Sequence, residues 1–404
     1  MSMNPTWEDV MKFNLPENPV LFDVGGYKGD WTQIALNKYV NPTIYVFEPV
    51  VEFYNIIVNR YKDNPNIKVF NFGLSSENKI EKISLNEDSS SVFVGDNLTD
   101  IKLVNIIDFL HQYDIFHVDL IKINIEGEEY RLLNHLIQYP ELNIFQNFLV
   151  QFHNFIENHV SIRNKILEEV LVYYDMVFNY EFIFEGWSIK KKQKINCIGD
   201  SHISIFSGLN MLIPENKTIV NDNFHVLRFG PYLANSFPNK ENIFKYVDTI
   251  PKNENLLICF GEIDCRAQIK NQTEKNGLNY KKVIDGVIFN YFNGIDKLTH
   301  KNIILFSVTP ELKETPFKIY YDKNPEDFDA PKGSYDERKL YKEYFNYKVK
   351  EQTELRGFKF ISIYEYLVNE KNTNNRHSLD DIHLTPKKVS YIINREIIKA
   401  KLTL

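Results

Sequence analysis

Residues Ile195–His202 read Ile-Asn-Cys-Ile-Gly-Asp-Ser-His, and this stretch lies almost midway along the 404-residue chain. A short apolar run stops at Gly199, and Ser201 follows at the turn. An α/β protein presents a nucleophile in this way, at the end of a strand that leads into a helix. The stretch therefore indicates the start of a second α/β domain (residues 191–404), preceded by one complete domain (residues 1–190).

The composition is that of a globular protein with a modest negative charge. Hydrophobic residues make up 43% of the chain, enough for a core in each half, and the formal net charge is −7. Nucleic acid or an anionic membrane would require a basic face, so we expect neither as a partner. We find no apolar run long enough for a signal peptide or a membrane span, and the three cysteines lack metal or disulfide spacing. We therefore expect a cytoplasmic protein with reduced thiols.

A glycine-rich turn follows the first predicted strand of the N-terminal half. Residues 19–31 (PVLFDVGGYKGDW) indicate a strand, a turn and a helix that starts at Asp30. The glycines allow the backbone to approach a ligand closely, and the helix start supplies free N–H groups. An ordinary βα turn is the alternative interpretation of this segment taken alone. The candidate cofactor-binding residues are Asp23, Gly25, Gly26 and Tyr27.

The next predicted strand ends in Glu48 and Pro49. They lie about twenty residues beyond the glycines, where an acid can accept hydrogen bonds from both hydroxyls of a ribose. A dinucleotide is one ligand of this kind, but the turn lacks the GxGxxG spacing that accommodates a pyrophosphate. The pattern suits S-adenosylmethionine better.

Polar residues follow two further predicted strands of this half. Asn124 and Glu126 lie at the end of an apolar, β-branched run, and the carboxyl ends of parallel strands are where open α/β sheets bind ligands. His153 follows another apolar strand and could remove the proton of a sugar hydroxyl. The alternatives are that Glu126 only favours a helix N-terminus through its charge, and that His153 is a hydrogen-bonded histidine at a strand end.

Residues from about 20 to 187 resemble an FkbM-type methyltransferase. The matching segments are residues 22–31, 46–49, 71–75, 89–92, 107–110 and 119–129. The resemblance implies a Rossmann-like fold, S-adenosylmethionine as the methyl donor and a hydroxyl as the acceptor. The family usually has Asp where this chain has Asn124, and a neutral amide is a poorer base and metal ligand. Glu126 and Glu129 remain available for such roles, and the sequence itself gives no support to a divalent metal.

Features of the C-terminal half supply the parts of an acyl-transfer site. Ser201 lies at the predicted start of a helix, where N–H groups can help to hold an oxyanion. Another buried-type strand ends in a glycine, and Asp264 follows it. Asp380 and His383 are three residues apart, so the carboxylate can orient the imidazole. The alternative is that scattered residues match this pattern by chance.

Residues from about 194 to 404 resemble the SGNH/GDSL hydrolases. The resemblance implies a flavodoxin-like three-layer fold, with Ser201 as nucleophile, His383 as base and Asp380 as its partner. It also makes Gly230 the candidate for a glycine whose backbone N–H joins the oxyanion hole.

The hydrolase family usually has the pattern Gly-x-Asn-Asp here. We align its Asn with Asp264, so this residue departs from the pattern. An ionised Asp would repel the oxyanion that an Asn would hold. Three explanations are open: Asp264 is protonated, Arg266 neutralises it, or the reaction differs from plain ester hydrolysis. A charged Asp264 predicts that Asp264→Asn raises the rate of hydrolysis.

Together the two resemblances imply a bifunctional enzyme of glycan modification. One half would methylate a hydroxyl of a sugar or polysaccharide with S-adenosylmethionine, and the other would remove or transfer an acyl group such as acetyl. One alternative keeps the methyltransferase and makes the second half a catalytically weak, SGNH-like glycan-binding module. Another is a natural-product tailoring enzyme. The expected fold class is α/β in two tandem domains, a Rossmann-like methyltransferase fold followed by a flavodoxin-like hydrolase fold.

Overall fold

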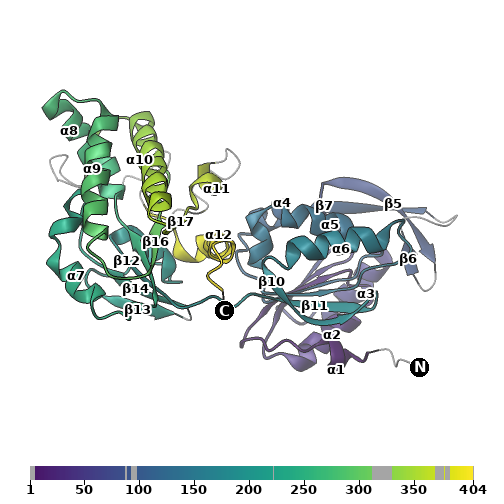
Figure 1. Ribbon diagram of the computed structural model, residues 1–404. Helices are drawn as coiled ribbons and strands as arrows, with labels where there is room; N and C mark the ends of the chain where they lie inside the picture. The colour runs from purple at the N-terminus through teal and green to yellow at the C-terminus, as the bar shows by residue number, and fades with distance from the viewer. Residues whose placement is uncertain are drawn as a thin grey trace. The chain divides into compact units, whose positions relative to one another are not determined.

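The chain forms two compact units, Met1–Lys190 and Lys191–Leu404 (Figure 1). The computed structural model describes residues 5–86, 89–91, 98–221, 223–311, 330–368, 377 and 383–403. Each unit contains a largely parallel sheet flanked by helices, so the predicted α/β fold class is confirmed. Within the described part of the chain, no helix is both long and apolar enough to cross a membrane.

The main sheet of the N-terminal unit has the strand order β10-β11-β9-β8-β1-β2-β3. The strands are β1 (Val20–Val24), β2 (Thr43–Phe47), β3 (Ile67–Phe70), β8 (Leu120–Ile123), β9 (Asn147–Val150), β10 (Tyr174–Tyr180) and β11 (Phe184–Ile189). Strands β3, β2, β1, β8 and β9 are parallel, whereas β11 runs antiparallel to both β9 and β10. The sheet is Rossmann-like, and the reversed strand β11, inserted between β9 and β10, distinguishes it from the dinucleotide fold.

Helices and a small second sheet complete this unit. The helices are α1 (Trp7–Val10), α2 (Asp30–Lys38), α3 (Val51–Tyr61), α4 (Ile106–Gln112), α5 (Glu129–Ile137), the 3-10 turn η1 (Pro140–Ile144) and α6 (His159–Val170). The second sheet has the order β4-β7-β5-β6 and consists of β4 (Gly73–Ser75), β5 (Lys79–Asn86), β6 (Ser89–Ser91) and β7 (Leu98–Asn105). Ile83, Ile101 and Leu103 of this sheet pack with Val50, which brings the small sheet against the end of β2.

The sheet of the C-terminal unit has the order β13-β14-β12-β15-β16-β17. The strands are β12 (Ile195–Gly199), β13 (Thr218–Asn221), β14 (Phe224–Arg228), β15 (Asn255–Cys259), β16 (Asn302–Phe306) and β17 (Lys359–Ile361). All except β13 are parallel. In chain order the parallel strands follow the flavodoxin-like arrangement, and the site of such a sheet lies beyond the carboxyl ends of its strands.

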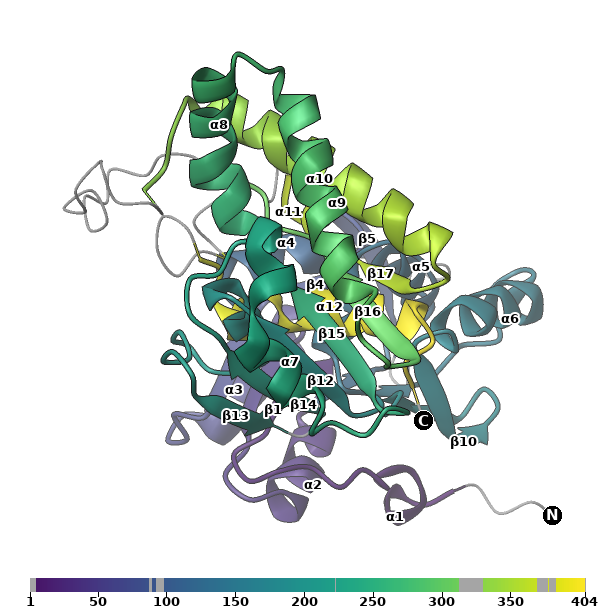
Figure 2. The ribbon, with the colours of Figure 1, turned by 60° about the vertical axis from the view of Figure 1, so that its left-hand side comes forward.

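Helices cover both faces of this sheet, so the unit has three layers. Figure 2 shows α7 (Glu241–Val247) and α9 (Tyr280–Ile295) in front of the strands and α12 (Pro386–Lys399) behind them. The front layer also contains η3 (Ala234–Asn239) and α10 (Tyr335–Leu355), whose apolar side chains share one core with β12, β14, β15 and β16. The other helices are η2 (Ser201–Phe206), η4 (Asp264–Gln268), α8 (Ile269–Asn276) and α11 (Tyr364–Val368).

Candidate active sites

The N-terminal unit has a cavity of about 360 Å³ at the carboxyl ends of β1, β2 and β8. This volume is within the range of small-molecule sites, about 300–1,000 Å³. The predicted cofactor residues Gly25, Gly26, Tyr27, Glu48 and Pro49 line it, together with Asn124 and Glu126. Apolar side chains from the small sheet and from α3 also line it, including Phe53, Ile83, Ile101 and Leu103.

The glycine turn packs closely against the segment that follows β8 and against β2. Gly25 has a φ of +84°, and a Cβ atom there would lie 1.9 Å from the carbonyl oxygen of Asn124. A Cβ on Gly26 would lie 2.4 Å from Cγ1 of Val46. The amides of both glycines donate to the carbonyl oxygen of Phe47, at 3.0 and 3.1 Å. Only glycine fits these positions without moving the turn.

Asp23 does not line the cavity but stabilises the glycine turn through its buried partners. It is fully buried, accepts a hydrogen bond from Thr32 Oγ1 at 2.7 Å and pairs with Lys122 Nζ at 3.0 Å. Lys122 also donates to the carbonyl oxygen of Gly25 at 2.6 Å and itself lines the cavity. The motifs of the N-terminal half did not single out Lys122. A lysine inside an otherwise apolar strand was the signal that could have found it, because an unpaired cation is costly to bury.

Glu48 already accepts two backbone hydrogen bonds. Its Oε2 accepts from the amide of Tyr27 at 2.7 Å, and its Oε1 accepts from the amide of Val50 at 2.8 Å. Burial raises the pKa of this carboxyl group to about 7. Each oxygen retains a second lone pair, so a ribose can still be bound. The carboxyl group links the glycine turn to the start of α3 and keeps acceptor capacity for a ligand.

Asn124 places an unpaired acceptor at the cavity. Its side-chain Oδ1 is buried and has no hydrogen-bond partner among the described residues. An acceptor left in this state costs about 1–3 kcal/mol. A donor on a bound ligand or an ordered water would remove this cost. This orphan atom and the tight glycine turn fit a polar ligand such as S-adenosylmethionine.

His153 lies between two carboxylates. Its Nδ1 is 3.1 Å from Glu129 Oε1, and its Nε2 is 3.5 Å from Glu126 Oε1. Burial alone would lower the pKa of His153, but the two glutamates raise it to about 9. At neutral pH the imidazole therefore holds a proton and has no lone pair for a hydroxyl proton. This differs from the general-base role expected for His153 and favours Glu126, which lines the cavity, as the proton acceptor.

His153→Gln is expected to flatten the alkaline loss of stability of the N-terminal unit. Since the pKa of His153 is raised from 6.5 to about 9 on folding, its stabilisation is complete below pH 6.5 and is lost as the pH rises through about 9. The loss should amount to about 3 kcal/mol in the wild type and be absent in the variant. All three tryptophans (Trp7, Trp31, Trp187) lie in this unit, so urea unfolding followed by tryptophan fluorescence reports on it. An equal pH dependence in both proteins would contradict the ion pairs.

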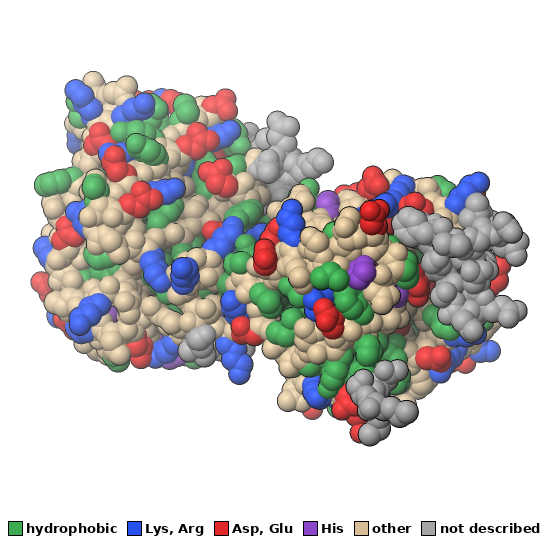
Figure 3. Space-filling view, turned by 45° about the vertical axis from the view of Figure 1, so that its right-hand side comes forward, with side chains coloured by type: hydrophobic (Ala, Val, Ile, Leu, Met, Phe, Trp, Pro, Cys, Tyr) green, Lys and Arg blue, Asp and Glu red, His purple; other side chains and the backbone are tan. Residues whose placement is uncertain are grey.

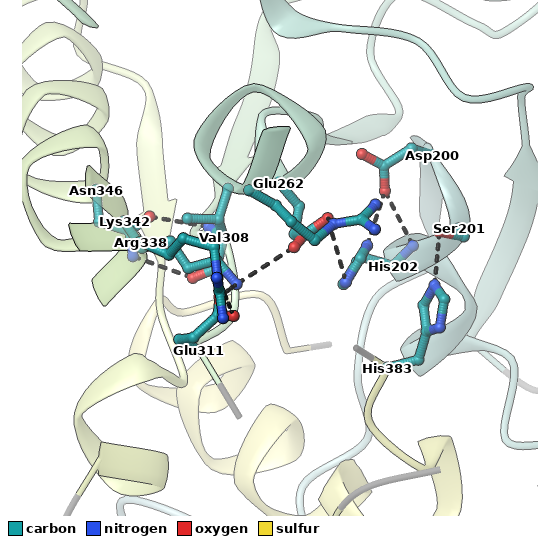
Figure 4. A network of polar contacts seen from close by, with 11 residues as sticks. Asp200, Ser201, His202, Glu262, Val308, Glu311, Arg338, Lys342, Asn346 and His383 are labelled. Carbon is teal, nitrogen blue, oxygen red and sulfur yellow. Dashed lines mark hydrogen bonds and ion pairs between the residues drawn. The ribbon is translucent and has the colours of Figure 1, made fainter. Parts of the chain in front are cut away.

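In the C-terminal unit the structure brings Ser201 and His383 together. Ser201 follows β12 and begins η2, a six-residue 3-10 helix. Its Oγ lies 2.7 Å from Nε2 of His383, which precedes α12 (Figure 4). This is the distance needed for the base to take the proton of the nucleophile. Asp380, the predicted orienting acid, lies outside the described residues.

Gly230 lies near the same edge of the sheet. It follows β14, whose last residue, Arg228, pairs with Gly199 of β12, and the amide of Phe229 donates to the carbonyl oxygen of Gly199 at 2.8 Å. The chain therefore passes Gly230 at the strand ends next to Ser201. This placement is compatible with the predicted oxyanion-hole role of its backbone N–H.

Asp264 has a role different from the one expected. It is buried, and its carboxylate accepts hydrogen bonds from the amides of Ala234 at 2.7 Å and Asn235 at 3.3 Å. Burial raises its pKa to about 7. It therefore holds the start of η3. Neutralisation by Arg266 was one of the three open explanations, and Arg266 pairs with Glu262 at 3.0 Å.

The family pattern was also placed one residue too late. When Gly-x-Asn-Asp is laid from Gly261, its Asn falls on Ile263 and its Asp falls on Asp264. The departure from the pattern is therefore at Ile263, whose apolar side chain has no donor for an oxyanion. Backbone N–H groups are the other kind of donor that could hold an oxyanion.

Asp264→Asn is expected to destabilise the C-terminal unit without raising the rate of hydrolysis. An amide group would turn an N–H donor toward a backbone donor and lose one of two hydrogen bonds, at a cost of about 1–3 kcal/mol. Chemical unfolding followed by circular dichroism measures this cost. Asp248→Asn is the matched control, since Asp248 forms a single, exposed pair with Lys252 and such pairs contribute little. Faster hydrolysis by Asp264→Asn would instead mean that a charged Asp264 repels the oxyanion.

Comparisons with known proteins add little to this geometry. No family model and no curated protein matches the chain. Among solved structures, a protein of Bacteroides fragilis described as a candidate acylhydrolase is 16% identical, over 52% of this chain and 88% of its own, with a TM-score of 0.32. A member of the lipolytic G-D-S-L family from Veillonella parvula is 15% identical, over 52% of this chain and 96% of its own (TM-score 0.31).

A third solved structure matches at a similar level. It is a protein of Clostridium thermocellum described as a candidate rRNA methylase, 8% identical over 43% of this chain and 88% of its own, with a TM-score of 0.28. Scores at this level decide neither fold nor activity. The fold rests on the two strand orders, and the function rests on the contacts at the two sites.

Proposed function

We propose that the C-terminal unit is a serine acyl hydrolase or acyltransferase. The 2.7 Å contact between Ser201 Oγ and His383 Nε2 carries this proposal. His383 would take the hydroxyl proton while Oγ attacks the acyl carbonyl, and the backbone N–H groups of Ser201 and Gly230 would face the oxyanion. His383 would then give its proton to the departing alcohol. Water, or a second hydroxyl in a transfer reaction, would release the acyl group from Ser201.

The N-terminal unit, in this proposal, is a methyltransferase that binds S-adenosylmethionine in its cavity. The cofactor would supply an electrophilic methyl group. Gly25 and Gly26 would approach it with their backbone, Glu48 would accept from its ribose, and Asn124 Oδ1 would accept from a donor. Glu126 would accept the proton of the attacking hydroxyl. Among the described residues no group of three or more His, Cys, Asp or Glu side chains could hold a metal ion, so no step is assigned to one.

The substrate class we propose for both units is a sugar or polysaccharide, with a cytoplasmic location. The support is the joint resemblance of the two halves to families that modify hydroxyl and acyl groups. The three buried, reduced cysteines are compatible with the cytoplasm. On the face shown in Figure 3, basic and acidic side chains are interspersed, and this pattern is not what a nucleic-acid partner requires.

A second candidate is a methyltransferase whose C-terminal unit binds glycans but turns over slowly. The observation that favours it is Ile263, since the side-chain donor of the family pattern is absent. Removing one such donor costs about 2.7–4 kcal/mol of transition-state stabilisation. A natural-product tailoring enzyme differs only in its acceptor, which product analysis would reveal.

The decisive experiment is an assay of acetate release when the protein is incubated with small acetyl esters or with acetylated oligosaccharides. The same preparation is tested for S-adenosylmethionine binding and, by mass spectrometry, for methylated products. Acetate release together with a methylated sugar is the expected result. Cofactor binding without any acetate release would favour the glycan-binding alternative.

A further inference from the structure

A second histidine lies directly beside the proposed base. His202 follows Ser201 in the chain, is 3% exposed and has its ring centroid 4.7 Å from that of His383, at an interplanar angle of 34° (Figure 4). The proposed reaction assigns no task to this buried, titratable side chain. Its ring packs against the imidazole that must gain and lose a proton.

Both ring nitrogens of His202 face carboxylate oxygens. Nδ1 lies 3.3 Å from Oδ1 of Asp200, and Nε2 lies 3.8 Å from Oε2 of Glu262. A neutral imidazole carries a proton on one nitrogen only, so its other nitrogen would lie close to a carboxylate with no proton of its own. Protonation of both nitrogens removes this repulsion. The geometry therefore favours a buried imidazolium at His202.

The carboxylate of Glu262 is held in its charged form by other cations. Arg266 Nε lies 3.0 Å away and Lys342 Nζ of α10 lies 3.2 Å away, and Lys342 also pairs with Glu311 at 2.8 Å. Burial opposes ionisation, but these cations and His202 lower the pKa of Glu262 below its usual range. Burial also disfavours the charged form of His202 and so lowers its pKa. The carboxylates of Glu262 and Asp200 more than offset this, so the pKa of His202 is raised.

We propose that His202 is a positioning residue for His383: a protonated ring that fixes the plane of the base and disfavours a second positive charge on it. The inference rests on the proposed hydrolase and goes beyond it, because it names a residue that would set the proton affinity of the base. His383 would stay unprotonated, and so able to accept the Ser201 proton, at a lower pH than without this neighbour. Once protonated, it would also be a stronger acid toward the departing alcohol.

The described charged groups around the pair are Asp200 at the end of β12, Glu262 and Arg266 after β15, and Lys342 on α10. Removing the charge of His202 leaves Asp200 and Glu262 without this partner. Both the loss of a cation and the unbalanced carboxylates favour a proton on His383. Both effects therefore raise the pKa of His383 in a variant that lacks the His202 charge.

The test is a histidine titration by NMR in the Ser201→Ala background, which needs no turnover. His202→Phe keeps a ring of similar size without charge, and is expected to raise the pKa of His383 by about 1 unit or more. His225→Phe is the matched control, because His225 lies on β14 toward the other end of the sheet and should leave the value unchanged. His202→Gln, neutral and polar, replaces the Phe variant if that protein does not fold.

Kinetics supply the second measurement in the protein with its native Ser201. The acidic limb of the kcat/KM profile for an acetyl ester should move to higher pH in His202→Phe by the same amount as the titration. An unchanged or lowered pKa of His383 in both His202 variants would overturn the proposal. Failure of the wild type to hydrolyse any ester would refute the proposed hydrolase instead, and the titration would still decide the electrostatic claim.

Discussion

Ser201→Ala is expected to lower ester hydrolysis by about 10⁴-fold or more, the loss seen when a member of such a catalytic group is removed. Without Oγ there is no atom for the acyl group to bind, and the His383 imidazole, 2.7 Å from that oxygen, has no hydroxyl proton to take. The measurement is acetate release from a small acetyl ester at several pH values. S-adenosylmethionine binding by the N-terminal unit should be unchanged.

Two further variants sharpen this result. His383→Gln should cost nearly as much as Ser201→Ala, and the double variant little more, because the residues act as one unit. Ser390→Ala is the matched control, since the hydroxyl of Ser390 donates to the carbonyl oxygen of Lys387 on α12, and its loss should leave the rate unchanged. Undiminished hydrolysis by Ser201→Ala would show that another nucleophile or a contaminant is responsible.

Gly25→Ala is expected to weaken S-adenosylmethionine binding by at least about 100-fold, which corresponds to ~2.7 kcal/mol. The added Cβ would lie 1.9 Å from the carbonyl oxygen of Asn124, at a φ of +84° that alanine rarely adopts. The turn must therefore move, and with it the amide of Tyr27 that donates to Glu48. Isothermal titration with S-adenosylmethionine and S-adenosylhomocysteine measures the change.

The control for this substitution is Gly286→Ala, the same chemical change at a helical glycine of α9 with nothing within 4 Å of the added atom. It should leave both cofactor binding and hydrolysis unchanged. Hydrolysis should also survive in Gly25→Ala. Equal cofactor affinity in Gly25→Ala and the wild type would mean that this cavity is not the cofactor site.

Local sequence patterns were sufficient for the fold class and for much of the candidate sites. Apolar runs that end in glycine predicted β1 and β12, because a strand buried between two helical layers is apolar on both faces. The helix start at Asp30 and the cavity-lining positions of Gly25, Gly26 and Glu48 follow from the same local logic. Such signals depend on neighbours in the chain, so one sequence is enough to find them.

Electrostatic roles depended on partners far away in the chain, and only the tertiary structure decided them. Asp264 was assigned to an oxyanion hole, yet it accepts from the amides of Ala234 and Asn235. His153 was a candidate base from the sequence, but its ion pairs with Glu126 and Glu129 favour its protonated form. The charge of a buried group depends on what surrounds it, and no local pattern contains that information.

The sequence by itself thus determined two α/β folds, a glycine turn suited to a cofactor and a serine at a strand end. The tertiary structure decided which residues meet: Ser201 with His383 across 182 positions of chain, Asp23 with Lys122 across 99, and His202 with Glu262. Periodicity and turn residues act over a few positions, and so can be seen in one sequence. Proton affinities and hydrogen bonds act across space, and they exist only once the sheets bring distant strand ends together.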